Sequence, residues 1–408
     1  MKEPASKPLP KNGGNIVRIF SLSSFLNDLG SNMIAPIWPA FVTTILGANM
    51  AILGFIDGLG EAMVSLSQAV GGYLSDRYRK RKVFIWFGYL CAGISRIGYA
   101  LSYIWQTVIP FRILDRFGKL REASRDAMIA EVSHDKNRGG NFGILRAFDN
   151  LGALVGIITV IILIRWLPLR AIFLLAALPS LLAVYLVVKY IKEDGTSQLP
   201  RMPFSFKELG RNYSLFLILS AIFSFGTFTY SFILLFGETL GISVIYAPLI
   251  YFLFTFFAST SSVPFGKLSD RIGRKKVIAL ALALWILMCL CIVESTRQPG
   301  WFLLATMFYG LHNGAMDTVQ KTYVSELAPP HHRTTGIGGF QMVVGLCTLP
   351  GALINGILWQ STGPSAAFIY SMSMAIVAFI MLFFIQDDHA SGTTTRTTRG
   401  TSTVYYKK

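Results

Sequence analysis

Charged residues are scarce in this sequence. Asp, Glu, Lys and Arg make up 14% of its 408 residues, whereas 53% are hydrophobic, and the mean hydropathy is +0.52. In soluble domains about a quarter of all residues are charged. The low fraction of charged residues here excludes a protein whose surface faces mostly water. A helix needs about 20 mostly apolar residues to cross a bilayer core of roughly 30 Å. Charge-poor stretches of that length recur along the chain, and they predict an integral membrane protein.

Histidine and cysteine are also rare, with five and four residues. Cys91, Cys289, Cys291 and Cys347 all fall in apolar stretches, and neither His nor a second Cys pair lies near the C-x-C of residues 289–291. We interpret them as small core residues and not as disulfides or a metal site. The sequence has no P-loop, no metal-ligand spacing and no Ser/His or Cys/His pairing, so we expect no cofactor, no metal and no enzyme activity. No cleavable signal peptide is predicted, because the first long apolar run exceeds a signal core in length.

Each apolar stretch is expected to be helical, because a segment in lipid must satisfy its own backbone hydrogen bonds. We predict an all-α membrane protein with twelve transmembrane helices. The predicted spans are residues 16–46, 49–74, 83–104, 105–131, 140–164, 168–190, 213–238, 243–266, 276–295, 300–325, 335–360 and 363–386.

Lys and Arg are distributed unevenly among the predicted loops and ends. One side of the membrane carries 25 of them, and the other side carries only Arg165, Arg170 and Arg297. Loops rich in Lys and Arg remain in the cytoplasm, so both termini are predicted to be cytoplasmic. We attribute the net charge of +16 to this orientation and expect no nucleic-acid partner.

Polar segments divide the chain into five parts. Two predicted six-helix halves, residues 16–190 and 213–386, are joined by a charged, Pro-containing cytoplasmic linker at 191–212. Residues 1–15 are predicted to be a cytoplasmic N-terminal segment. Residues 387–408, rich in Thr, Gly and Arg, are predicted to be a disordered cytoplasmic tail.

The two halves repeat each other in sequence. Gly72, Leu74, Ser75, Asp76 and Arg77 match Gly266, Leu268, Ser269, Asp270 and Arg271 at an offset of 194 residues. Glu131, Arg138 and Gly143 match Glu326, Arg333 and Gly338 at an offset of 195 residues. Two registers that agree to one residue across half the chain predict a tandem repeat of six spans.

The repeated loop resembles the G-x-L-x-D-R-x-G-R-[RK] signature of the major facilitator superfamily. The copy from Gly266 to Lys275 matches it fully, and the first copy has Arg79 in place of the second Gly. The resemblance implies a transporter whose two halves enclose a central site. It also implies a cytoplasmic gate, for which the candidates are Gly72, Asp76, Arg77, Gly266, Asp270, Arg271, Gly273, Arg274 and Asp126.

The fourth predicted span extends the resemblance. The stretch from Arg112 to Gly118 is similar to the family's R-x-x-Q-G-x-G pattern, with Asp115 and Arg116 in place of Gln and Gly. Gly118-Lys119 and Arg125-Asp126-Ala127 together resemble a GKG-x-R…RDA stretch, one residue shorter here, of poorly characterised bacterial and archaeal efflux-type members. The fifth span lacks the Gly-Pro pair of the family's antiporter signature.

Ionisable residues at membrane depth are costly and therefore face a cavity or a partner. We predict a substrate cavity lined by residues drawn from Asn27, Arg96, Arg112, Asp115, Arg116, Arg146, Asp149 and Asp317. Asp28 is a candidate proton carrier, with Arg112 at a suitable depth to pair with it, and the alternative is a permanently paired carboxylate. Asp57 and Glu61, one helical turn apart, form the second candidate for proton binding.

We expect a secondary active transporter in the plasma (cell inner) membrane that exports a small organic solute by alternating access, coupled to protons. Its expected partners are the small-molecule substrate, protons and the lipid bilayer, and it is expected to act as a monomer. One alternative is a proton-coupled importer of a small organic or anionic solute. Another is a sensor that has lost transport, or a membrane enzyme.

Overall fold

The computed structural model describes residues 13–78, 80–133, 137–192, 210–328 and 333–386. The predicted tail, and most of the predicted linker and N-terminal segment, lie outside these residues. So do the side chains of residues 69, 72–76, 138 and 333–335. Every regular element in the described ranges is helical, so the chain has the predicted all-α fold.

The first group of helices, here the N-terminal bundle, extends to residue 190. Its elements are α1 (Gly13–Ile34), η1 (Ala35–Ile37), α2 (Trp38–Ala40), η2 (Phe41–Ile45), α3 (Met50–Tyr78), α4 (Arg81–Leu101), α5 (Trp105–Phe117), η3 (Gly118–Leu120), α6 (Arg121–Glu131), α7 (Arg138–Leu163) and α8 (Leu169–Tyr190). Within it α1 packs against α7 and α8, and α4 packs against α5 and α8.

The second group, here the C-terminal bundle, begins at residue 211. Its elements are α9 (Arg211–Gly226), α10 (Tyr230–Thr239), η5 (Val244–Tyr246), α11 (Ala247–Ile272), α12 (Arg274–Ser295), α13 (Gly300–Leu327), α14 (Arg333–Thr362) and α15 (Pro364–Leu382). Here α13 packs against α11 and α12, and α9 packs against α14 and α15.

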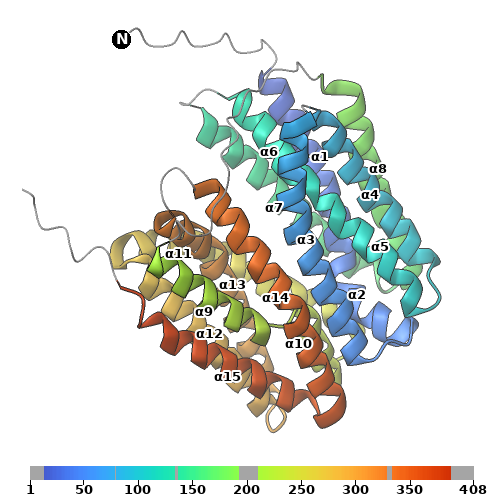
Figure 1. The fold of residues 1–408 in the computed structure, drawn as a ribbon. Helices are drawn as coiled ribbons and strands as arrows, with labels where there is room; N and C mark the ends of the chain where they lie inside the picture. Colours follow the sequence, from blue (N-terminus) through green and yellow to red (C-terminus); the bar gives the residue numbers. More distant parts are fainter. Residues whose placement is uncertain (1–12, 79, 134–136, 193–209, 329–332, 387–408) are drawn as a thin grey trace, which may run out of the picture.

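The two bundles meet along α3 and α14, which lie side by side (Figure 1). Glycines permit this contact. A Cβ added to Gly58 would come within 2.8 Å of the Leu349 Cα, and one added to Gly356 would come within 2.4 Å of the Met50 carbonyl oxygen. Because these positions lack side chains, the two backbones approach closely, as small residues allow in membrane helices.

Three of the predicted continuous spans are interrupted, which corrects their prediction. The first (16–46) passes through 3-10 and π turns beyond Ile34, where Pro36 and Pro39 supply no backbone N–H. The fourth (105–131) has the 3-10 turn η3 in its middle. The seventh (213–238) is broken between Gly226 and Tyr230.

The break in the seventh span is stabilised by Asn355 of α14. Its side-chain amide donates to the carbonyl oxygens of Gly226 and Thr227 at 3.1 and 3.3 Å, and the residue is fully buried. At membrane depth, the hydrogen-bonding groups of unwound backbone must find partners within the protein. Asn355 supplies such a partner, so the segment can remain non-helical and its side chains can make other contacts.

Nine helices in the described ranges are long and apolar enough to cross a membrane. Three predicted spans are not among these nine, namely the first, the fourth and the tenth. They are helical over 13–45, 105–131 and 300–327, but they are less apolar than a membrane-crossing helix usually is. These segments are rich in polar residues that face the interior, such as buried Ser21, Ser24 and Asn27. The count of twelve spans therefore stays a prediction.

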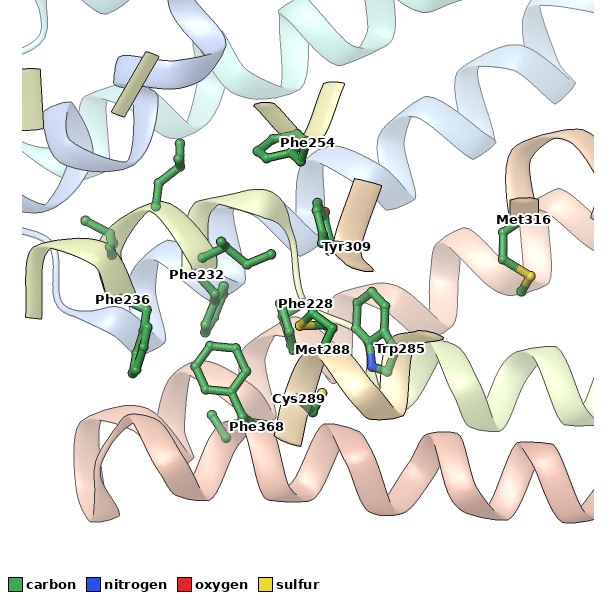
Figure 2. Packing of buried hydrophobic residues seen from close by; sticks show 14 of the residues in the cluster. Phe228, Phe232, Phe236, Phe254, Trp285, Met288, Cys289, Tyr309, Met316 and Phe368 are labelled. Atoms are coloured by element: carbon green, nitrogen blue, oxygen red, sulfur yellow. The ribbon is translucent and has the colours of Figure 1, made fainter. Parts of the chain in front are cut away.

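Aromatic side chains fill the core of the C-terminal bundle (Figure 2). Phe228 contacts Trp285 and Phe368 with ring centroids 4.9 Å apart in both cases. Phe232 and Phe236 lie on the same side of α10 and are buried with them. This packing holds the broken segment before α10 rigidly against the bundle.

All four cysteines are free, and Cys91, Cys289 and Cys291 are buried.

Candidate functional site

A central cavity lies between the two bundles. It consists of two adjoining chambers of about 220 and 200 Å³, which share Glu61, Arg112, Arg116 and Tyr230 in their walls. The N-terminal bundle contributes the polar wall: Ser31, Asn32, Trp38, Asp57, Glu61, Arg96, Tyr99, Arg112, Asp115, Arg116, Lys119 and Arg121. The C-terminal bundle contributes Phe228, Thr229, Tyr230, Tyr251, Tyr309 and Thr348.

Asp57 of α3 joins the two bundles through its carboxylate. One oxygen accepts hydrogen bonds from Trp38 Nε1 at 2.9 Å and from the Arg112 guanidinium at 2.8 Å. The other oxygen accepts from the hydroxyls of Thr229 at 2.8 Å and Ser231 at 2.5 Å, which belong to the C-terminal bundle. Asp57 is 1% exposed, so this buried carboxylate ties α2, α3 and α5 to the broken seventh span.

The other hydrogen bonds found between the bundles lie toward the same side of the molecule. Tyr251 of α11 donates to Asn32 Oδ1 at 3.3 Å, and the backbone N–H of Met50 donates to Gln360 Oε1 at 3.4 Å. Met50 begins α3, whose far end leads into the basic loop at 77–82. These contacts therefore close the cavity on the side opposite the basic loops, here called the outer side.

Arg112 of α5 is paired with Asp57 and not with Asp28, which corrects the predicted pairing. Its guanidinium carbon also lies 4.2 Å from the centroid of the Trp38 ring. The side chain is 6% exposed and the Asp57 side chain is 1% exposed. A buried guanidinium held between a carboxylate and an indole face has little freedom to take another partner in this conformation.

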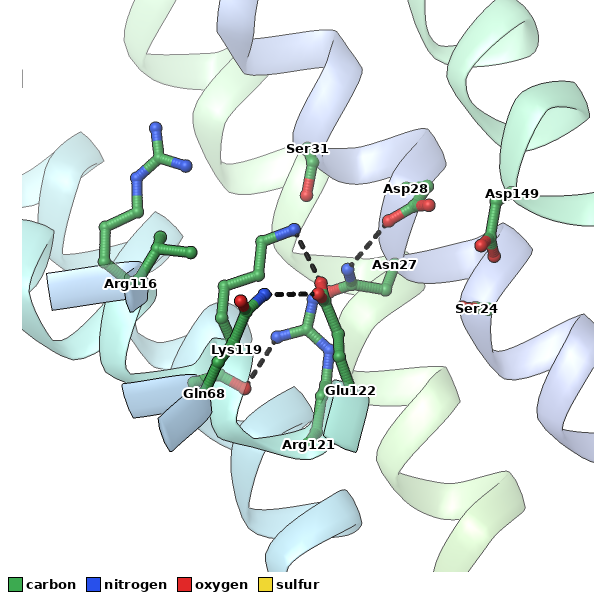
Figure 3. A network of polar contacts seen from close by, with 12 residues as sticks. Ser24, Asn27, Asp28, Ser31, Gln68, Arg116, Lys119, Arg121, Glu122 and Asp149 are labelled. Atoms are coloured by element: carbon green, nitrogen blue, oxygen red, sulfur yellow. Dashed lines mark hydrogen bonds and ion pairs between the residues drawn. The ribbon is translucent and has the colours of Figure 1, made fainter. Parts of the chain in front are cut away.

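Asp28 lies in a polar cluster beside the cavity (Figure 3). Its only side-chain hydrogen bond within the described residues comes from Asn27 Nδ2 at 3.2 Å, and no cation lies within ion-pair distance of it there. Lys119, Arg121 and Glu122 are the nearby charged groups of the α5–α6 segment (Figure 3). The Asp28 carboxylate thus keeps unused hydrogen-bonding capacity, unlike that of Asp57.

Arg96 of α4 is fully buried among neutral acceptors. It donates to the carbonyl oxygens of Ala176 and Asn27 at 2.8 and 3.1 Å and to Ser31 Oγ at 2.7 Å, and it also contacts Ser180 Oγ. Neighbouring Gly30 leaves room for the guanidinium, since a Cβ there would overlap it. Arg96 therefore links α1, α4 and α8 in the wall of the cavity.

The charged side chains of α5, η3 and α6 divide between the cavity and its surroundings. Arg112, Asp115, Arg116 and Lys119 line the larger chamber. Asp126, a candidate gate residue, is bound by its neighbour Arg125 at 2.9 Å.

The other ion pairs of these segments differ in distance. Arg116 lies 3.7 Å from the Glu61 carboxylate, whereas Lys119 binds Glu122 at 2.8 Å. Asp115 has neither a hydrogen bond nor an ion pair to any described residue.

Asn27, Arg146, Asp149 and Asp317 are not among the described residues that line the two chambers, which corrects their prediction as cavity residues. Arg146 and Asp149 pair with each other at 3.4 Å on α7, and the Arg146 side chain is 65% exposed. Asp317 lies on an exposed position of α13. Depth along a helix is visible in the sequence, but the direction in which a side chain points depends on the rotation of the packed helix.

The predicted gate is partly described. Arg274 at the start of α12 pairs with Asp270 of α11 at 2.5 Å and with Glu326 of α13 at 3.2 Å, so it joins three helices. Gly266 faces α13, where a Cβ would meet Thr318 at 3.3 Å, and Gly273 adopts a φ of +97° that favours glycine. Arg271 is exposed.

In the N-terminal copy, Arg77 is exposed, and the side chains of residues 72–76, which include the candidates Gly72 and Asp76, lie outside the described residues. Arg81 binds Glu131 at 2.6 Å. Because Glu131 matches Glu326 in the sequence repeat, this pair is the counterpart of the pair between Arg274 and Glu326.

Comparison with known proteins decides the family. The family model described as Major Facilitator Superfamily matches residues 20–258 and 214–405. The chain belongs to the Major Facilitator Superfamily. An uncharacterized MFS-type transporter of Methanocaldococcus jannaschii is 34% identical over 402 residues, covering 94% of this chain and 100% of the relative.

Two other similar proteins are less alike in sequence. The multi-drug resistance efflux pump PmrA of Streptococcus pneumoniae is 23% identical over 382 residues, covering 90% of this chain and 94% of the pump. The crystal structure of a mutant of the nucleoside transporter NupG has a TM-score of 0.77 at 14% identity, covering 91% of this chain and 100% of NupG. The chain therefore has the fold of superfamily transporters.

Several residues of the site were not predicted from the sequence. Trp38, Thr229 and Ser231 gave no signal of their own, because Ser, Thr and Trp are common in membrane helices. Arg121 did carry a signal, since it is a charged residue within the predicted fourth span, but it was not among the candidates. Gly60 is a further example. A Cβ on it would lie 3.1 Å from Arg112 Nε and 3.3 Å from Arg116 Nε, so this glycine lets both guanidinium groups lie against α3. Its place between Asp57 and Glu61 was the only available hint.

Proposed function

We propose that this chain is a secondary active transporter that exports a small organic solute by alternating access, with proton movement as the energy source. The central cavity carries the proposal, because both bundles line it and hydrogen bonds from both bundles close it on the outer side. Alternating access requires such a site, with contacts that form in one state and break in the other. The name of the efflux pump among its relatives favours export.

The carboxylates of Asp57 and Asp28 suit different tasks in this proposal. The Asp57 carboxylate already accepts four hydrogen bonds, which is about the capacity of an ionised carboxylate. In this conformation the Asp57 carboxylate helps to close the outer side of the cavity. Asp28 accepts one hydrogen bond from Asn27, so its carboxylate has room to take a proton. We assign proton coupling to Asp28, and Glu61, whose side chain is 42% exposed, is the next candidate.

Flux measurements in proteoliposomes test both the transporter and its coupling. The wild-type protein is expected to exchange a labelled solute from a panel of small organic solutes, and a proton gradient is expected to drive its net movement. Asp28→Asn fixes the neutral form of this side chain, so it should abolish proton-driven flux while exchange, which needs no net proton movement, continues.

Two outcomes would contradict these assignments. Full proton-driven flux in Asp28→Asn would move coupling to another carboxylate, and Glu61→Gln would be tested next. If no solute of the panel exchanges in either the wild-type protein or the mutant, the chain is better explained as a sensor that has lost transport.

The same proposal places both termini in the cytoplasm and the chain in the plasma membrane. The uneven distribution of Lys and Arg supports this orientation. A reporter fused after Lys408 that is active only in the cytoplasm is expected to be active, and one that is active only outside the cytoplasm is expected to be silent. The reverse pattern would place the outer side of the cavity toward the cytoplasm and turn export into import.

A further inference from the structure

The two walls of the central cavity differ in charge. The wall from the N-terminal bundle carries five cationic side chains, those of Arg96, Arg112, Arg116, Lys119 and Arg121, and three carboxylates, those of Asp57, Glu61 and Asp115. Among the described residues, the wall from the C-terminal bundle has no charged side chain and presents Phe228, Thr229, Tyr230, Tyr251, Tyr309 and Thr348. A bound solute therefore meets a cationic surface on one side and an aromatic surface on the other.

Some of these cations already have strong partners. Arg112 is paired with Asp57 at 2.8 Å, and Lys119 is paired with Glu122 at 2.8 Å. These two pairs are compact, so their net charge is close to zero at the cavity surface. The positive charge of the cavity wall therefore comes from the other three cations.

The other three cations are less well neutralised. Arg96 donates only to neutral oxygens. Arg121 donates to the Gly118 carbonyl oxygen at 2.8 Å and lies over the Tyr89 ring at 5.0 Å. Arg116 has the Glu61 carboxylate at 3.7 Å, and its Nε is buried without a hydrogen-bond partner.

Arg116 occupies the position from which a solute can be bound. It lines both chambers of the cavity, as does Tyr230 on the opposite wall. Its side chain is 18% exposed, so the guanidinium can be reached. A planar guanidinium pairs with a carboxylate through two parallel hydrogen bonds, which gives strong and oriented binding in a partly buried site.

The aromatic wall is built to contact an apolar body. The rings of Tyr230 and Tyr251 lie 5.2 Å apart, and Tyr251 contacts Phe254 at 4.8 Å, so the tyrosines support one another. The hydroxyl of Tyr251 is engaged with Asn32. Such rings bury apolar surface and accept edge or face contacts from a flat solute.

We propose that the solute is an organic anion with a flat apolar body, its carboxylate bound by Arg116 and its body against Tyr230 and Tyr251. This proposal rests on the proposed transport function and names the substrate class of that same cavity. A cationic solute is disfavoured, because Asp115 is the only lining carboxylate without a hydrogen bond or ion pair to a described residue, whereas Arg96 and Arg121 have no carboxylate partner there.

Binding to the purified protein tests the proposal with three probes that share one ring. Benzoate, benzamide and benzylamine carry a negative, a neutral and a positive head group, and phenyl phosphate separates a carboxylate site from a phosphate site. Calorimetric titration is expected to give at least roughly tenfold tighter binding of benzoate than of benzamide or benzylamine. Tighter binding of phenyl phosphate than of benzoate would overturn the carboxylate assignment.

Variants locate the binding group. Arg116→Gln should weaken benzoate binding by roughly 10- to 100-fold, and Arg116→Lys, which keeps the charge, should lose less. Arg146→Gln is the matched control, because Arg146 is an exposed arginine of the same bundle outside the cavity. Tyr251→Ala should weaken benzoate binding, whereas Tyr251→Phe should retain most of it.

Several results would overturn the proposal: benzylamine bound as tightly as benzoate, no selective binding of any anion, or full benzoate affinity in a folded Arg116→Gln protein. The failures can be told apart from a failure of the transport function. If the protein exchanges only neutral or cationic solutes, the transport function is supported and the anion site is contradicted. If the protein binds anions through Arg116 but exchanges no solute, the anion site is supported and the transport function is contradicted.

Discussion

Asp57→Asn is expected to destabilise the protein by about 3–5 kcal/mol, because it leaves the Arg112 guanidinium buried without its counter-charge. Both side chains are nearly inaccessible, at 1% and 6% exposure. Arg112→Gln should have an effect of similar size, since it strands the carboxylate instead. The double variant removes both charges and should be destabilised by less than the sum of the two single variants. Thermal unfolding of the purified proteins in detergent measures all three.

The matched control for this pair is Arg146→Gln, because Arg146 pairs with Asp149 at 3.4 Å but is 65% exposed. An exposed pair contributes little to stability, so the free energy of unfolding of this variant should lie within about 0.5 kcal/mol of that of the wild-type protein.

Strictly additive losses of stability for Asp57→Asn and Arg112→Gln would show that the two residues do not act as a pair. Solute exchange should also fall in Asp57→Asn, because the hydrogen bonds to Thr229 and Ser231 that close the outer side lose their charged acceptor.

Gly58→Leu is expected to hold the outer side open. A Cβ at this position would already come within 2.8 Å of the Leu349 Cα and 3.1 Å of the Ala352 Cβ. A leucine side chain therefore cannot fit while α3 and α14 are in contact. Overpacking typically costs about 1–3 kcal/mol, which would shift the population away from the outer-closed state by roughly 5- to 150-fold.

Spin labels at residues 166 and 297 report this change. Trp166 is 80% exposed and the Arg297 side chain is 80% exposed, and both lie in connections on the outer side, one in each bundle. Gly58→Leu should lengthen the distance between the labels and slow solute exchange. Gly143→Leu is the control, because nothing lies within 4 Å of a Cβ at Gly143. Equal distances in both variants would mean that α3 and α14 do not separate when the outer side opens.

The coarse architecture could be predicted from the sequence because its causes are local or repetitive. Scarce charge and long apolar stretches are properties of each segment alone, and they suffice for helices in a membrane. The loop from Gly266 to Lys275 and its first copy at an offset of 194 residues carried the family resemblance. The family match over both halves confirms that resemblance.

The helix breaks were only partly visible. Pro36 and Pro39 mark the turns beyond Ile34, since proline removes a backbone donor. The break between Gly226 and Tyr230 has no such signal. It depends on Asn355, which lies 129 residues away from Gly226 along the chain and satisfies its carbonyl oxygen. A break that is stabilised by a distant side chain cannot be inferred from the residues at the break.

The sequence by itself determined that Asp28, Asp57, Glu61 and Arg112 lie at membrane depth and require partners, because burying a charge is costly wherever the helix is placed. Only the tertiary structure decided which partners they have. Arg112 and Asp57 are 55 residues apart, and Asp57 and Thr229 are 172 residues apart. Their meeting depends on the rotation of α3 and α5 and on the close approach of α3 to α14, which many packing contacts determine together. For the same reason Arg146 points away from the cavity while Arg116 points into it, although both lie at membrane depth in the sequence.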